Sequence, residues 1–229
     1  MNTYIMIDLD HTLVISPITK VLNNIRKDLA KLAGVSEEYV HRVWLEIEAR
    51  YVAISSPKAF DWNYILEEVC KALNVKYYVD IIELFYDNCK DVEVLDNAYT
   101  VLEMLRSMGY ILVLSTNGLS KYQLCVIKEV QLDKYFDYMV FPDTIGCLKN
   151  CRRFYEEFAS RGKVITVGDS YFFDVYYPKL FGFKSIFVYR GYMEDIFTRI
   201  FRIDTSIEPD ATINNLQNLP RILPNIESS

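Results

Sequence analysis

Residues 4–13 read YIMIDLDHTL, an apolar run that ends at the two carboxylates Asp8 and Asp10. Parallel strands buried on both faces have nearly continuous apolar sequences. In an open α/β sheet, polar groups that bind a ligand follow the carboxyl ends of such strands. The stretch therefore predicts a buried first strand that places two acidic residues at one edge of a parallel sheet.

Three later apolar runs end in the same abrupt way, each followed by small polar or acidic residues. They are residues 110–114 before Ser115-Thr116-Asn117-Gly118, residues 138–141 before Pro142-Asp143, and residues 164–167 before Gly168-Asp169-Ser170. Further strands are predicted at residues 185–189 and 210–213. Amphipathic segments separate them, at residues 96–108, 120–131, 150–161, 172–181 and 214–223. This alternation predicts an α/β fold with a parallel sheet covered by helices on both faces.

The connection between the first two strands is anomalous, because about a hundred residues separate Leu9 from Tyr110 and a crossover needs only one helix. Helical periodicity occurs at residues 21–32, ended by Gly34, and at residues 37–51 after the N-cap Ser36. It recurs at residues 61–73 and 76–89. We therefore predict a core domain of residues 1–14 and 91–229 with a four-helix cap domain inserted at residues 15–90. Residues 193–203 are predicted to be helical without an assigned role, and residues 225–229 to be disordered.

Composition excludes several classes of protein. The chain has 229 residues, 51% hydrophobic and 24% charged, with a net charge of −6, so it can bury a sizeable core and offers no basic surface for nucleic acid. It has no run of 18 apolar residues, and Asp8 and Asp10 interrupt the place of a signal-peptide core. The five cysteines are scattered and odd in number, which suits a reducing interior, so a cytoplasmic location is expected. With two histidines in the chain, structural zinc is not expected.

The residues at the predicted strand ends suit phosphoryl chemistry. A carboxylate such as Asp8 can attack phosphorus, and its neighbour Asp10 can protonate the leaving oxygen and later deprotonate water. Because the substrate is a dianion, the site needs positive charge, which Mg²⁺ held by oxygen ligands including Asp169 would supply. Thr116 and nearby backbone N–H groups would bind phosphate oxygens, and Lys149 would balance the remaining charge.

Each of these signals is weak alone. Asp-x-Asp is common in solvated and calcium-binding loops, although Leu13 and Thr19 stand where an EF-hand needs Gly and Glu. Ser115-Thr116-Asn117-Gly118 alone indicates a turn, Gly168-Asp169-Ser170 alone a helix N-cap, and Lys149 alone a surface lysine. The ordered set carries the interpretation, since each member adjoins a predicted strand or helix.

With these residues, the chain resembles the haloacid dehalogenase-like (HAD) hydrolase superfamily over nearly its whole length. The matching motifs are Asp8-Leu9-Asp10-His11-Thr12, Leu114-Ser115-Thr116-Asn117-Gly118, Lys149, and Gly168-Asp169-Ser170-Tyr171-Phe172-Phe173-Asp174. The resemblance implies a Rossmann-like core, a C1-type helical cap and Mg²⁺-dependent phosphoryl transfer. It implies Asp8 as nucleophile and metal ligand, and Asp10 as acid/base and as a metal ligand through its carbonyl. It also implies Asp169 as metal ligand, Thr116, Asn117 and Lys149 as phosphate-binding residues, and Asp174 as a supporting acid.

Three positions depart from the family pattern: His11 replaces a frequent Gly, Asn150 a common Pro, and Phe173 a polar residue. The predicted function is a Mg²⁺-dependent phosphatase that acts on a small phosphorylated metabolite through an aspartyl-phosphate. The alternatives are a dehalogenase, which attacks carbon without a metal and lacks the second acid, a phosphomutase, and an inactive binding protein. Asp10 and Asp169 favour the phosphatase. Neither the substrate nor the oligomeric state is predicted.

Overall fold

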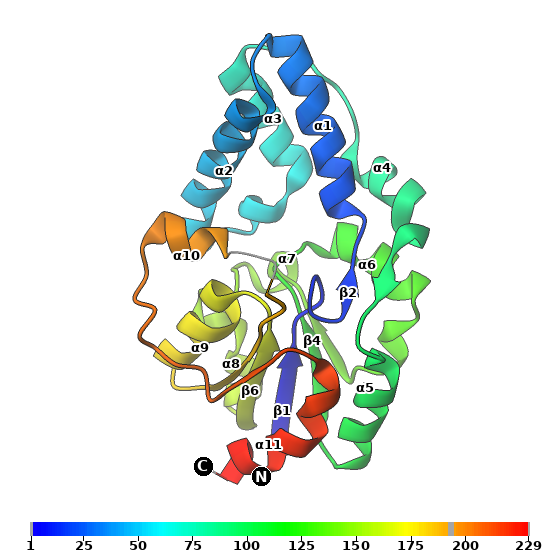
Figure 1. The fold of residues 1–229 in the computed structure, drawn as a ribbon, viewed down its shortest axis with the longest axis vertical. Helices are drawn as coiled ribbons and strands as arrows, with labels where there is room; N and C mark the ends of the chain where they lie inside the picture. Colours follow the sequence, from blue (N-terminus) through cyan, green and yellow to red (C-terminus); the bar gives the residue numbers. More distant parts are fainter. Residues whose placement is uncertain (1, 192–194, 229) are drawn as a thin grey trace.

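The computed structural model describes residues 2–191 and 195–228. Its centre is a six-stranded parallel sheet in the order β5-β4-β1-β6-β7-β8 (Figure 1). The strands are β1 (Asn2–Ile7), β4 (Ile111–Ser115), β5 (Tyr138–Val140), β6 (Gly162–Gly168), β7 (Lys184–Val188) and β8 (Ala211–Ile213). The chain runs outward from β1 first through β4 and β5 and then through β6, β7 and β8. The Rossmann-like fold predicted from the sequence is confirmed, and its switch point lies at β1, between β4 and β6.

Both faces of the sheet are buried, as the apolar strand sequences require. In β1, Ile5 and Ile7 join one hydrophobic cluster, and Tyr4 and Met6 join another on the opposite face. The helices of this region are α5 (Ala98–Ser107), α6 (Ser120–Glu129), α7 (Pro142–Ile145), α8 (Glu156–Ala159), α9 (Tyr177–Leu180) and α11 (Leu219–Ser228), while α10 (Ile196–Phe201) lies beside α2 (Glu37–Ala53) (Figure 1). The other helical turns of this region are the 3₁₀ turns η3 (Leu132–Lys134), η4 (Arg152–Phe154) and η6 (Leu216–Asn218) and the π-helical turn η5 (Tyr171–Tyr176).

Four helices lie beyond one end of the sheet and belong to the chain between β1 and β4 (Figure 1). They are α1 (Ile18–Ala33), α2 (Glu37–Ala53), α3 (Trp62–Leu73) and α4 (Ile81–Asn88), with the turns η1 (Pro57–Phe60) and η2 (Cys89–Asp91). Gly34 ends α1 at a φ of 66°, and the Ser36 hydroxyl caps α2 by accepting from the Tyr39 N–H. The short strands β2 (Val14–Ile15) and β3 (Glu93–Val94) pair where the chain leaves and re-enters the sheet region. The division into two domains stays a prediction.

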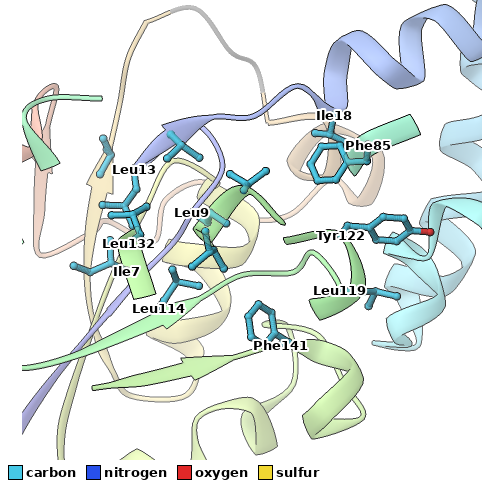
Figure 2. Packing of buried hydrophobic residues seen from close by; sticks show 14 of the residues in the cluster. Ile7, Leu9, Leu13, Ile18, Phe85, Leu114, Leu119, Tyr122, Leu132 and Phe141 are labelled. Carbon is cyan, nitrogen blue, oxygen red and sulfur yellow. The ribbon is translucent and has the colours of Figure 1, made fainter. Parts of the chain in front are cut away.

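The helical segment and the sheet region share a hydrophobic cluster. Figure 2 shows Ile18 and Phe85 of the helical segment close to Leu9, Leu119 and Tyr122. Tyr122 also packs against Trp62 with 4.4 Å between ring centroids. A disulfide that the sequence did not indicate joins Cys89 of η2 to Cys125 of α6. The cytoplasmic location stays a prediction. None of the described helices is long and apolar enough to cross a membrane.

Two predicted helices near the sheet have a different form. Residues 150–161 form η4 and α8 instead of one helix, and the chain turns at Tyr155, whose hydroxyl donates to the Lys149 carbonyl at 2.9 Å. Residues 172–181 form the π-helical turn η5 followed by α9. Pro178 has no N–H to donate to the Asp174 carbonyl, which accepts from the Thr166 hydroxyl instead.

Other predicted boundaries were wrong for identifiable reasons. The helix expected at residues 76–89 begins at Ile81, because Asp80 caps it through the Ile82 N–H. Residues 225–228, expected to be disordered, belong to α11, in which Glu227 accepts hydrogen bonds from Thr3 and Tyr110. Of the helix predicted at residues 193–203, residues 193–194 lie outside the described residues, and α10 occupies residues 196–201.

Candidate active site

The predicted site residues meet at the switch point of the sheet. Asp8 follows β1, Thr116 follows β4, and Asp169 follows β6. Together with Asp10 and Asn117 they line a cavity of about 290 Å³ between the sheet and the helical segment. Lys149 forms an ion pair with Asp8 and a second one with Asp174, which brings both residues to the site. The seven residues singled out in the sequence therefore lie together. Asp143, at the end of β5, lies apart from this arrangement and accepts hydrogen bonds from Ser120.

Lys149 is the buried cation of the site. Its side chain is only 2% exposed, and Nζ lies 2.6 Å from Asp8 Oδ1 and 2.7 Å from Asp174 Oδ1. Burial alone would lower the pKa of Lys149, but the charges of Asp174 and Asp8 raise it above the usual value. Lys149 therefore carries a positive charge between two carboxylates.

Three carboxylates form a group that could hold a metal ion. One oxygen each from Asp8, Asp169 and Asp174 lie within 4.8 Å of one another. Burial and the charges of its neighbours raise the pKa of Asp169 well above its usual value, and burial is the main cause that raises the pKa of Asp174 to about 7. A divalent cation would reduce the repulsion among these three carboxylates. Mg²⁺ is a suitable cation, because it prefers oxygen ligands such as carboxylates. Asp174 is thus nearer to the candidate ligands than its predicted supporting role implied.

Asp10 is a separate acid that faces the cavity. Its Oδ2 accepts from Gln123 Nε2 at 2.6 Å, while its buried Oδ1 has no hydrogen-bond partner among the described residues. Burial and the nearby Asp8 charge raise the pKa of Asp10, although hydrogen bonds from Ser16 and Gln123 partly oppose the rise. Gly118 makes this arrangement possible, since a Cβ there would lie 2.0 Å from Gln123 Nε2.

The loop that carries Asp8 and Asp10 is held from several sides. The Thr12 hydroxyl donates to Asp169 Oδ1 and accepts from the Asp169 N–H, both at 3.1 Å. Arg190 donates to the His11 and Thr12 carbonyls at 2.8 Å and pairs with Asp96 at the same distance. His11 has a φ of 60°, a conformation that glycine adopts most easily. The His-for-Gly departure is thus accommodated with a positive φ.

The phosphate-binding candidates are linked to the Lys149 loop. The Thr116 hydroxyl accepts from the Gly118 N–H at 3.0 Å and keeps its own proton available to donate. Asn117 Oδ1 accepts from the Lys149 N–H at 3.0 Å, which leaves its NH₂ group for another acceptor. Asn117 therefore supports the position of Lys149 in addition to its predicted role.

The two remaining departures from the family pattern also have structural explanations. Asn150, which stands where Pro is common, donates to the Val52 carbonyl of α2 at 2.8 Å. Phe173 lines the cavity and packs edge-on against Phe60 of η1 at 6.0 Å. The adjacent Asp174 still faces Lys149, in the space left by Gly168, where a Cβ would lie 2.2 Å from Asp174 Oδ2.

Sequence reasoning missed four residues that shape the site. Gln123 binds Asp10, Arg190 holds the His11–Thr12 loop, Glu48 of α2 lines the cavity, and Asp195 accepts from the Ser170 hydroxyl at 2.6 Å. Arg190 could have been found, because it follows a predicted strand as the acidic residues do. For the other three, the sequence contains no motif that we recognise.

Comparison with solved structures shows which proteins share this fold. Among solved structures, a HAD phosphatase from Thermococcus onnurineus superposes with a TM-score of 0.73 at 23% identity, covering 97% of this chain and 98% of that one. The HAD-hydrolase YfnB from Bacillus subtilis, bound to magnesium, has a TM-score of 0.68 at 16% identity, covering 97% and 98%. An L-2-haloacid dehalogenase from Xanthobacter autotrophicus, with chloropropionic acid covalently bound, has a TM-score of 0.65 at 18% identity, covering 98% and 99%.

These three structures share the fold of the chain. No curated protein sequence matches the chain. The model of the haloacid dehalogenase-like hydrolase family matches residues 3–176, a range that includes every predicted site residue. The chain therefore belongs to the haloacid dehalogenase-like hydrolase family.

Proposed function

We propose that this hydrolase is a phosphatase that uses Mg²⁺ to cleave small phosphate monoesters through a phosphorylated Asp8. The observation that carries the proposal is the contrast between two neighbouring carboxyl groups. Asp8 is paired with the Lys149 ammonium, whereas the pKa of Asp10 is raised by burial and by the Asp8 charge. Carboxyl groups whose environments differ in this way suit a nucleophile beside a general acid.

The proposed reaction has two steps. Lys149 holds Asp8 Oδ1, so Oδ2 would attack phosphorus while the bond to the ester oxygen breaks and Asp10 protonates the departing alcohol. The ionised Asp10 would then take a proton from water, whose oxygen attacks phosphorus and breaks the bond to Asp8. Inorganic phosphate leaves, and Asp8 and Asp10 return to their starting states. The Thr116 hydroxyl would donate to a phosphate oxygen.

The residues present fit a divalent cation. The carboxylates of Asp8, Asp169 and Asp174 would hold it, and Asp10 would add its backbone carbonyl, as the family resemblance implies. When bound, Mg²⁺ supplies positive charge that lets a phosphate dianion approach the acidic group. Burial is the main cause that raises the pKa values of Asp169 and Asp174, and the charge of Asp8 adds to it in both. A bound cation would stabilise the ionised forms of these buried carboxyl groups, which supports the assignment.

The cavity lining argues against the other predicted activities. A 2-haloacid carries a carboxylate, and a mutase must hold a second phosphate, so both need a cationic group away from the reacting atoms. Among the described residues that line the cavity, none is Lys or Arg. An inactive binding protein would have no need of the Asp8 and Asp10 pair.

The test is hydrolysis of p-nitrophenyl phosphate by the purified protein. We expect phosphate release with Mg²⁺, loss of release with EDTA, and recovery when excess Mg²⁺ is added. The same preparation should release no halide from 2-chloropropionate. Halide release in EDTA without phosphatase activity would establish a dehalogenase and overturn the proposal. No hydrolysis across a wide panel of phosphate esters would also contradict it.

A further inference from the structure

The cavity wall opposite the carboxylate group is mainly apolar. The helical segment and α10 contribute Ile18, Leu22, Phe60, Trp62, Ile196 and Phe197. Among the described residues of the helical segment, Glu48 is the one polar side chain in the cavity lining. Asp195, directly before α10, also lines the cavity, but it already accepts hydrogen bonds from Ser170 and Phe172. A sugar phosphate would bring several hydroxyl groups to this wall, and most of them would lack a free partner. The wall instead suits a carbon chain or ring that carries one polar group.

Glu48 has few partners for a buried carboxyl group. Only 8% of the residue is exposed, and Oε1 accepts from Trp44 Nε1 at 2.7 Å. Arg26 is the nearby cation that favours its ionised form, but the Arg26 guanidinium forms hydrogen bonds with His41 and Asn23. In the part of the chain that the structure describes, Glu48 forms no ion pair within 4.0 Å.

This environment is unfavourable for an isolated charge. Burial raises the pKa of Glu48 to about 7, although the Trp44 hydrogen bond and the Arg26 charge oppose the rise. A hydrocarbon side chain of similar size would be more stable in this wall. A positively charged group of a ligand would therefore form a strong ion pair with the Glu48 carboxylate at this position.

The charge of the rest of the site favours the same ligand. The negative groups of the site are the phosphate dianion and the carboxylates of Asp8, Asp169 and Asp174, and the positive groups are Lys149 and one divalent cation. The total negative charge is the larger of the two. An additional acidic group on the substrate would be repelled, and a cationic group would be attracted. The aromatic rings of Phe60, Trp62 and Phe197 can also attract an ammonium group.

We propose that the substrate is a phosphate monoester whose alcohol part carries an amino group, and that Glu48 binds the resulting ammonium ion. This inference rests on the proposed phosphatase function, because that function places the phosphate at Asp8. The apolar wall would contact the carbons between the two charged ends. Glu48 would thus select the substrate by charge while the acidic group performs the chemistry.

The test measures binding of non-hydrolysable phosphonates by calorimetry in the presence of Mg²⁺. A series of ω-aminoalkyl phosphonates of increasing chain length is compared with alkyl and ω-hydroxyalkyl phosphonates of the same length. At the best length, the aminoalkyl compound should bind about 10- to 100-fold more tightly than either analogue, as expected for a charge-assisted hydrogen bond in a buried site. Equal binding of amino and alkyl compounds at every length, or of amino and hydroxyl compounds, would overturn the proposal.

Substitutions identify the residue responsible. Glu48→Gln keeps an oxygen for Trp44 and removes the charge, so the preference for the amino compound should fall about tenfold or more. The matched control is Glu46→Gln, which changes an exposed residue of the same helix outside this cavity and should keep the preference. An unchanged preference in Glu48→Gln would refute the role of this residue. Because binding needs no turnover, amino selectivity without hydrolysis would refute the phosphatase proposal and leave the ligand assignment intact.

Discussion

Replacing Lys149 by Met removes the buried cation and leaves its two carboxylate partners unpaired. At the observed N–O distances of 2.6 and 2.7 Å, each attraction amounts to about 6 kcal/mol with an effective dielectric constant of about 20. Part of this gain offsets the cost of burying the ammonium group. Breaking a buried ion pair from one side typically destabilises a protein by about 3–5 kcal/mol, which is the loss of unfolding free energy that we expect at pH 8.

The loss should be smaller at pH 5. The pKa of Asp174 is already about 7, above its usual value, and removal of Lys149 would raise it further. A carboxyl group with a raised folded-state pKa contributes its stability at low pH and loses it as the pH rises through that pKa. At pH 5 the unpaired Asp174 carboxyl group of the variant would therefore be protonated and less costly.

Urea unfolding in EDTA at the two pH values measures both effects without a metal ion. Lys128→Met, at an exposed position of α6, is the control and should change stability by less than about 0.5 kcal/mol. A loss below about 1 kcal/mol for Lys149→Met at pH 8, or a larger loss at pH 5 than at pH 8, would refute this account of the buried charges.

Three further predictions concern other parts of the site. Asp8→Asn should abolish turnover of p-nitrophenyl phosphate and leave the circular dichroism spectrum unchanged. Asp10→Asn should slow turnover by about 10²–10⁴-fold. Near-normal turnover by Asp8→Asn would exclude the covalent mechanism. Glu48→Gln should stabilise the protein by roughly 3 kcal/mol at pH 8 and by little at pH 4. The Glu48 carboxyl group has a pKa of about 7 in the folded protein and an ordinary pKa of 4.5, so the wild-type protein loses stability as the pH rises from 4.5 to 7. Equal unfolding curves of the two proteins at pH 8 would contradict this. Arg190→Met should lower the melting temperature and the turnover rate together, because it frees the His11–Thr12 loop; a loss of stability with full activity would show that this contact does not position the site.

The sheet could be predicted because its strands are apolar on both faces and end in recognisable groups. Tyr4–Ile7 needs no alternation of polar residues, since both faces are covered, and Asp8 marks where the strand ends. The meeting of Asp8, Thr116 and Asp169 could be predicted for the same reason, because parallel strands bring their carboxyl ends to one edge. Asn117, Lys149 and Asp174 came from the family resemblance or from a loop position, and the roles of all seven residues stay predictions. What the linear pattern does not contain is distance, and so the contact of Asp174 with the metal-ligand candidates came only from the structure.

Helix boundaries and the cavity wall depend on contacts between distant residues. The π-helical turn before α9 reflects the Thr166 hydroxyl, which donates to a carbonyl that Pro178 cannot satisfy. The order of residues 225–228 depends on Glu227 and its contacts with Thr3 and Tyr110 at the other end of the chain. Glu48 was missed because an acid on a helix usually faces solvent, and its periodic position became meaningful only once α2 was placed over the cavity.

The disulfide between Cys89 and Cys125 changes the mechanics of the helical segment. It fastens the C-terminal end of that segment to α6, next to α4, whereas α2 lies on the other side, beside α10 (Figure 1). There, the connections to the Lys149 loop are non-covalent: hydrogen bonds from the Leu148 N–H to Ser55 and from Asn150 to Val52, and apolar packing of Val52 against Leu148. If the helical segment opens as a unit, the covalent margin would stay in place and the non-covalent margin would separate. Such an opening would expose the cavity on the α2 side and would break the hydrogen bonds beside Lys149.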